Sequence, residues 1–156
     1  MPVRNGIFNA REIGRLALSL LFKTIMFRPR HTTSERLRLK MAVHTGPVFA
    51  GIVGELNPRY SVFGETIFVT HRLLAVTKGT DCTLTSTWVL VLMNSSITGF
   101  TIRCSASAQN LMETFGSFVL SRLDEVFIKG KGLQPTYQLF GENGKERTLA
   151  FKLFFA

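Results

Sequence analysis

Cysteine is scarce in this chain, which has only Cys82 and Cys104 among 156 residues. These two form at most one disulfide bond, and their separation matches no metal-binding spacing. Long apolar runs are also missing, because the longest, residues 88–93, is far shorter than the ~20 residues of a membrane-spanning helix. The first residues lack the charged, apolar and cleavage segments of a signal peptide. These absences predict a protein of a reducing, cytosolic compartment.

Acidic residues are few, with 10 Asp and Glu against 19 Lys and Arg, which gives a formal net charge of +9. Such an excess can indicate a nucleic acid or an anionic membrane as partner. Here the basic residues are scattered, and no zinc-finger spacing, RNA-recognition signature or basic-zipper pattern accompanies them. We therefore interpret the charge as a solvated basic face and expect no nucleic acid as partner. A basic nucleic-acid binder is the minority alternative.

What is present suffices for one folded domain, because 46% of the residues are hydrophobic. Apolar residues recur along residues 7–22 with the spacing of one helix face, and Asn9 is a candidate N-terminal cap. Apolar and polar residues alternate over residues 36–43, which predicts a half-buried strand. A second helix is predicted over residues 64–78.

The second half of the chain gives weaker signals. A short strand is predicted over residues 82–84, followed by Thr85 and Ser86 as a capping pair before residues 87–92. Residues 94–109 are rich in Ser and Thr and have no clear period. Further strands are predicted over residues 117–120, 126–128 and 136–140. Because helices and strands alternate, the predicted class is α+β with a mainly antiparallel sheet.

Residues 37–72 are the most informative part of the chain. They contain, in order, LRLKMAVHTGPV, GIVG and PRYSVFGET, and they end on Arg72. This stretch resembles the C-terminal half of a class III nucleotidyl cyclase domain, the module that converts GTP or ATP to a 3′,5′-cyclic nucleotide. The receptor-type guanylate cyclases are the most similar group. The resemblance is supported by PVRNG and AREI near the N-terminus, by RPRH and ERLRL, and by IKGKG, TY and LFG near the other end.

The resemblance implies a ferredoxin-like cyclase fold over residues 1–142, lacking the family's N-terminal strand and metal-binding half. Loss of that strand would leave strand edges exposed. Residues 93–110 are interpreted as an insertion that forms a long surface loop or represents a translated intron. Residues 143–156 are interpreted as a tail that is unrelated to the family.

Three residues match nucleotide-contacting positions of the family. Arg72 corresponds to the arginine that stabilises the transition state, and its planar guanidinium suits phosphate oxygens. Ser61 stands where guanylate cyclases carry cysteine and adenylyl cyclases aspartate, and its hydroxyl can both donate and accept. Lys129 corresponds to the lysine that contacts the triphosphate. In isolation each also has an ordinary interpretation, as an exposed helix arginine, a strand-end serine and a turn lysine.

Other positions depart from the family. Phe68 replaces an asparagine that orients the ribose, and a phenyl ring cannot make amide hydrogen bonds. His71, beside Arg72, is interpreted as a surface or packed side chain. The two aspartates that hold Mg²⁺ or Mn²⁺ in the family are expected upstream of Pro2, and none of the chain's ten acidic residues matches them. We therefore expect no metal ligand in this chain. Gly46, Gly51 and Gly54 are assigned to turns and a dimer surface.

The function predicted from these observations is a partial, diverged guanylate cyclase domain that cannot cyclise GTP alone. Its expected partners are GTP and a second cyclase domain, as a homodimer or heterodimer. The resemblance implies Mg²⁺ or Mn²⁺ as cofactor, with the ligands absent from this chain. The alternative is a non-catalytic dimerisation or regulatory partner of an intact cyclase. The resemblance places the chain at the cytoplasmic face of the plasma membrane, attached only through a parent receptor. A fragment of a longer gene product, or a gene-prediction error, is a further alternative.

Overall fold

The computed structural model describes residues 6–28, 30, 39–76, 83–86, 89–93 and 100–143, with only the backbone described between 83 and 100. Three helices and eight strands lie in this part of the chain. In chain order they are α1 Phe8–Met26, β1 Leu39–Val43, β2 Phe49–Val53, β3 Arg59–Phe63, α2 Glu65–Val76, β4 Thr83–Ser86, β5 Val89–Met93, β6 Phe100–Ser105, α3 Ala106–Glu113, β7 Phe118–Ile128 and β8 Gly132–Glu142.

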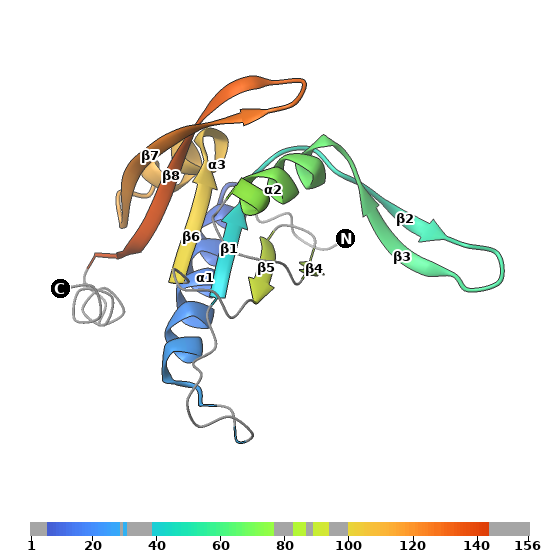
Figure 1. Ribbon diagram of the computed structural model, residues 1–156, viewed down its shortest axis with the longest axis horizontal. Coiled ribbons are helices and arrows are strands. Elements are labelled where there is room, and N and C mark those ends of the chain that lie inside the picture. The colour runs from blue at the N-terminus through green and yellow to red at the C-terminus, as the bar shows by residue number, and fades with distance from the viewer. Residues whose placement is uncertain are drawn as a thin grey trace.

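Six strands form one sheet in the order β4-β5-β1-β6-β8-β7, and β2 and β3 form a separate hairpin. Among the described strands only β1 and β6 run parallel to each other, and each other pairing is antiparallel. Helices α1 and α3 lie on one face of the sheet and α2 lies on the other, while the β2–β3 hairpin projects away from both layers (Figure 1). The predicted α+β class with a mainly antiparallel sheet is confirmed.

Each face of the sheet has its own hydrophobic core. The larger core joins α1 and α3 to β1, β6 and β8, through residues such as Leu21, Met41 and Leu139. The smaller one joins α2 to β1 and β7, through residues such as Leu73, Ala42 and Ile128. The sheet therefore forms a central layer between two layers of helix.

Strand β1 lies deeper than its sequence indicates. Its alternation predicts one solvated face, but all five residues are buried, and Lys40 is only 2% exposed. Met41 belongs to the core on one face and Ala42 to the core on the other, so both faces are covered. Both edges are also paired, with β5 from Leu39 to Val43 and with β6 over the same residues. The prediction of a half-buried strand is wrong for β1, and neither edge of this strand is exposed.

The surface loop predicted over residues 93–110 is also wrong where the structure describes it. Residues 100–105 form β6, and Ala106 begins α3, whose N-terminal cap is Ser105. The Oγ atom of Ser105 accepts a hydrogen bond from the backbone N–H of Ala108 at 3.3 Å. Ile102 is 1% exposed in the larger core, so this segment is part of the central sheet. A strand of six residues with polar neighbours gives too short a pattern to be recognised. Residues 94–99 lie outside the described part.

Smaller differences concern where elements begin and end. The cap of α1 is Ile7, which makes no side-chain hydrogen bond, so Asn9 lies inside the first turn. The predicted cap at Thr85 and Ser86 is wrong, because both residues belong to β4, and the strand β5 begins at Val89. The two strands predicted over residues 117–128 form the single strand β7, which is interrupted by bulges in its pairing with β8.

Other predictions fall on residues that the structure does not describe. These are the end of the second predicted helix after residue 76, Cys82 and the tail after residue 143. Cys104 lies in β6 and is a free, buried thiol. Within the described ranges, none of the helices is both long and apolar enough to cross a membrane.

Candidate functional site

Ser61 lies in the middle of β3, in the projecting β2–β3 hairpin. Its partner across the hairpin is Gly51, and residues that face each other in an antiparallel pair lie on the same side of the ribbon. A Cβ atom added to Gly51 would meet nothing within 4 Å, so the space beside Ser61 is open. The hairpin turn contains Gly54, whose φ of 113° is available to glycine but strained for other residues. Ser61 is therefore half-buried and accessible from one side.

Arg72 is exposed on α2, one turn after Phe68. Its Cζ atom lies 5.1 Å from the centroid of the Phe68 ring, which is a cation–π contact. Such a contact at an exposed site stabilises the pair by about 0.5–1 kcal/mol. Phe68 thus holds the guanidinium along the helix surface. A side chain amide at that position would instead offer hydrogen bonds to a ligand. His71 is exposed next to Arg72.

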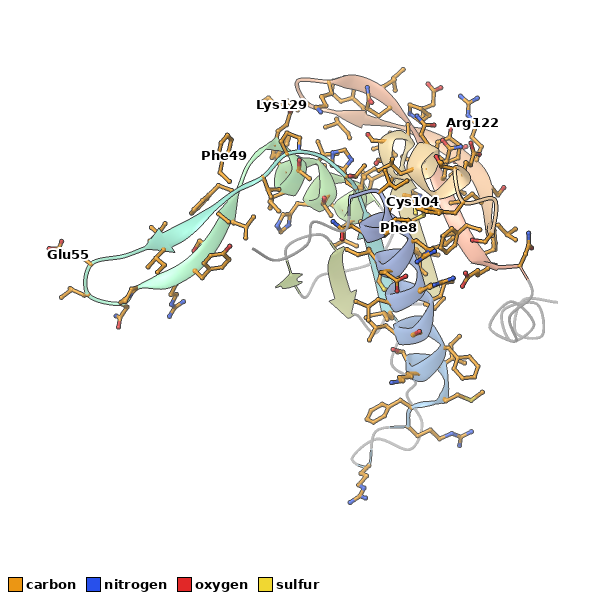
Figure 2. All side chains as sticks on the ribbon, turned by 180° about the vertical axis from the view of Figure 1, so that it is seen from behind. Phe8, Phe49, Glu55, Cys104, Arg122 and Lys129 are labelled. Atoms are coloured by element: carbon orange, nitrogen blue, oxygen red, sulfur yellow. The ribbon has the colours of Figure 1, made fainter. Side chains whose placement is uncertain are left out.

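Lys129 lies at the tip of the β7–β8 hairpin (Figure 2). The turn is closed by a hydrogen bond of 2.9 Å from the backbone N–H of Lys131 to the carbonyl oxygen of Ile128. Lys131 Nζ forms an ion pair of 3.1 Å with Glu65 Oε1 at the first residue of α2. Lys129 is exposed and, within the described residues, has no ion pair. Hence Lys131 joins this turn to α2, and Lys129 is left available to a ligand.

The three predicted site residues therefore lie on elements that meet at the N-terminal end of α2. Strand β3 runs into α2 through Gly64, and the Lys131–Glu65 ion pair brings the β7–β8 turn to the same place. No hydrogen bond, ion pair or ring contact joins Ser61, Arg72 and Lys129 to one another in the described part of the chain. The arrangement brings the three elements together but does not link the side chains of Ser61, Arg72 and Lys129.

Two further features lie in this region, of which sequence reasoning missed the first and assigned the second to turns and a dimer surface. His44 follows β1, and its Nδ1 atom lies 2.7 Å from Ser105 Oγ at the start of α3. Burial lowers the pKa of His44; the charge of Lys131 lowers it further, and that of Glu65 raises it. The second feature is Gly46, where an added Cβ would collide with Oγ1 of Thr66. His44 could have been found from the sequence, because it is a polar residue directly after a strand.

A metal ion has no evident site in the described residues. They contain no group of three or more His, Cys, Asp or Glu side chains that could hold one. Glu65, four residues after Ser61, is paired with Lys131. The described residues therefore do not fit a two-metal site.

Comparison with protein families gives one match over most of the chain. Residues 3–141 match the model described as the adenylate and guanylate cyclase catalytic domain. The chain is 37% identical over 142 residues to human atrial natriuretic peptide receptor 2, covering 91% of this chain and 12% of the receptor. It is 35% identical over 144 residues to mouse guanylate cyclase 2G, covering 92% of this chain and 11% of that protein. The chain thus spans only about one eighth of the length of these relatives.

Two solved structures have a similar fold. The guanylate cyclase domain of RhGC from Catenaria anguillulae, in complex with GTP, superposes with a TM-score of 0.64 at 24% identity. That alignment covers 86% of this chain and 60% of the other. The catalytic core of a rhodopsin-guanylyl cyclase with converted specificity, in complex with ATPαS, gives a TM-score of 0.58 at 23% identity. It covers 83% of this chain and 58% of that one. At these identities the likeness concerns the fold, and it agrees with the predicted cyclase fold.

Proposed function

Because the chain belongs to the family of adenylate and guanylate cyclase catalytic domains, we propose that it is a diverged guanylate cyclase domain that binds GTP without cyclising it alone. The observation that carries the proposal is the convergence at α2. There Arg72 and Lys129, both exposed cations, lie on elements joined by the Lys131–Glu65 ion pair. Two cations of this kind suit a triphosphate, which carries several negative charges.

In this proposal each residue has a separate task. Lys129 contacts the terminal phosphates, and the exposed turn gives it room to do so. Arg72 contacts the α-phosphate, where its charge would offset the negative charge that develops during attack by the ribose 3′-oxygen. Ser61 contacts the purine edge, because its hydroxyl can serve as donor or acceptor. Phe68 is the weak point, since it offers the ribose no hydrogen bond and keeps Arg72 against its own ring.

Metal ions must come from elsewhere in this scheme. Cyclases of this family use divalent metal ions, and the described residues do not supply a site for them. A second cyclase domain would provide the metal-binding aspartates across a dimer interface. The chain would then contribute one half of a composite site, and the isolated chain would be inactive.

The test is a complementation assay for cGMP formation from GTP and Mn²⁺. The chain is assayed alone and mixed with the cyclase domain of human natriuretic peptide receptor 2 in which the equivalent of Arg72 has been removed. We expect no cGMP from the chain alone, weak formation in the mixture, and an increase of at least tenfold with Phe68→Asn. Arg72→Ala should abolish the signal of the mixture. Formation of cGMP by the chain alone, or a mixture insensitive to Arg72→Ala, would contradict the proposal.

The exposed hairpin favours a second candidate function, that of a non-catalytic partner of an intact cyclase. Phe49 is 77% exposed and Ile52 is 74% exposed, and their spacing in β2 puts them on opposite sides of the ribbon. Figure 2 shows Phe49 on the hairpin, away from the body of the domain. Four more large hydrophobic side chains of the hairpin are exposed, namely Val53, Leu56, Tyr60 and Phe63. Apolar surface of this extent marks a protein–protein contact.

Sedimentation velocity with and without an intact cyclase domain tests this candidate. Ile52→Asp should abolish association, whereas Leu133→Asp, an exposed residue of the β7–β8 hairpin, should leave it unchanged. A chain that stays monomeric and leaves cyclase activity unaltered would remove this function. Since one of the relatives is named a receptor, we also propose that association with a membrane, and a position at its cytoplasmic face, would come through a parent receptor.

A further inference from the structure

A pocket of about 210 Å³ lies where the beginning of α1, the end of β1 and α3 meet. Its apolar wall includes Ala10 and Ile13 of α1 and Leu111 of α3. Asn9, His44 and Thr45 provide its polar groups. None of the residues assigned to GTP lines this pocket, so it is a second site, independent of the proposed cyclase function.

The polar groups of the pocket are available to a ligand. Ser105 Oγ accepts from the N–H of Ala108 and contacts His44 Nδ1 at 2.7 Å, which fixes the position of the imidazole. The other ring nitrogen of His44, the amide of Asn9 and the hydroxyl of Thr45 have no hydrogen-bond partner among the residues described. An apolar pocket with a few unengaged polar groups is the usual form of a small-molecule site.

The character of the lining points to an uncharged ligand. No Lys, Arg, Asp or Glu is among the described residues that line the pocket. His44 is neutral near pH 7 because burial lowers its pKa from 6.5. The Lys131–Glu65 ion pair nearby is itself neutral as a unit. A charged ligand would lose its hydration without gaining an opposite charge in return.

The volume limits the size of the ligand. An engineered cavity of about 150 Å³ holds one benzene molecule, so a pocket of about 210 Å³ holds one ring with a small substituent. We propose that this pocket binds an uncharged compound with a single ring that carries a carboxamide or hydroxyl group. The ring lies against Ala10, Ile13 and Leu111, and the substituent is bound by Asn9, His44 and Thr45.

Benzamide and benzoate make a suitable pair of probes, because they have nearly the same shape and differ by one charge. Each is titrated into the full chain while NMR signals of alanine methyl groups and of the His44 ring are followed. We expect benzamide to shift the signals of Ala10, Ala108 and His44 saturably, with a Kd on the order of 1 mM. Benzoate should bind at least tenfold more weakly at this site, although the chain has a net charge of +9.

Three variants decide whether the pocket is responsible. Ala10→Leu fills the pocket and should weaken benzamide binding at least tenfold, while Ala75→Leu, at an exposed position of α2, should leave it unchanged. Thr45→Val keeps the side-chain shape without the hydroxyl and should weaken binding several-fold. The proposal would be overturned if benzamide gave no saturable shift or if benzoate bound equally well. It would also be overturned if Ala10→Leu and Thr45→Val bound benzamide as the unaltered chain does.

Discussion

Replacement of Ile102 by alanine tests the assignment of residues 100–105 to the centre of the sheet. Ile102 is 1% exposed in β6 and packs in the core that α1 and α3 share with β1. Truncation of a buried Ile to Ala costs about 2–5 kcal/mol, because apolar surface is lost and a cavity remains. We expect about 3 kcal/mol here, since β6 is held between β1 and β8 and has little freedom to collapse into the cavity. For a domain of this size each kcal/mol lowers Tm by about 2–4 °C, which gives roughly 6–12 °C.

The assay is urea unfolding followed by circular dichroism, together with a thermal scan. The control is Ile52→Ala, the same chemical change at a side chain that is 74% exposed in the β2–β3 hairpin. It should change the free energy of unfolding by less than about 0.5 kcal/mol. Measurement at low protein concentration keeps association through that hairpin out of the comparison. If Ile102→Ala cost no more than Ile52→Ala, this segment would lie at the surface, and the assignment of β6 to the core would be wrong.

The remaining predictions concern the end of β1, the buried thiol and one glycine. Burial lowers the pKa of His44 from 6.5, so the unfolded chain binds a proton first as the pH falls, and stability decreases below about pH 7. His44→Asn should therefore reduce the loss of stability between pH 7 and 5, measured by urea midpoints, and an unchanged loss would refute this. Burial raises the pKa of Cys104 from 9.0 to about 12, so in a Cys82→Ser background a thiol reagent at pH 8 should react only after denaturation. Reaction of the folded chain at the denatured rate would contradict the burial of Cys104. Gly46→Ala forces the added methyl against Thr66 Oγ1, which donates a hydrogen bond of 2.7 Å to the carbonyl oxygen of Pro47. We expect a loss of about 1–3 kcal/mol that becomes smaller in a Thr66→Ala background, whereas additive losses would show that the two sites do not touch.

The sequence determined the family and the main elements. The order of LRLKMAVHTGPV, GIVG and PRYSVFGET in residues 37–66 was enough to indicate a cyclase domain, through its resemblance to that family. The β2–β3 hairpin within this stretch was not predicted. Local periodicity likewise located α1, whose apolar face is long enough to be recognised, and start and stop signals located α2. These features depend on neighbours in the chain, which is why the sequence alone contains them.

Only the tertiary structure decided which strands lie at the centre and which polar side chains meet. β1 became a fully buried strand because β5 and β6 pair with its two edges and helices cover both faces. Lys131, rather than Lys129, became the contact to α2 because the β7–β8 turn places its ammonium 3.1 Å from Glu65. The pocket at His44 arose because the beginning of α1, the end of β1 and α3, far apart in sequence, meet in one place. Such contacts join residues that are far apart in the chain. They cannot be read from the sequence, because the hydrophobic pattern of each segment reflects only its own helix or strand.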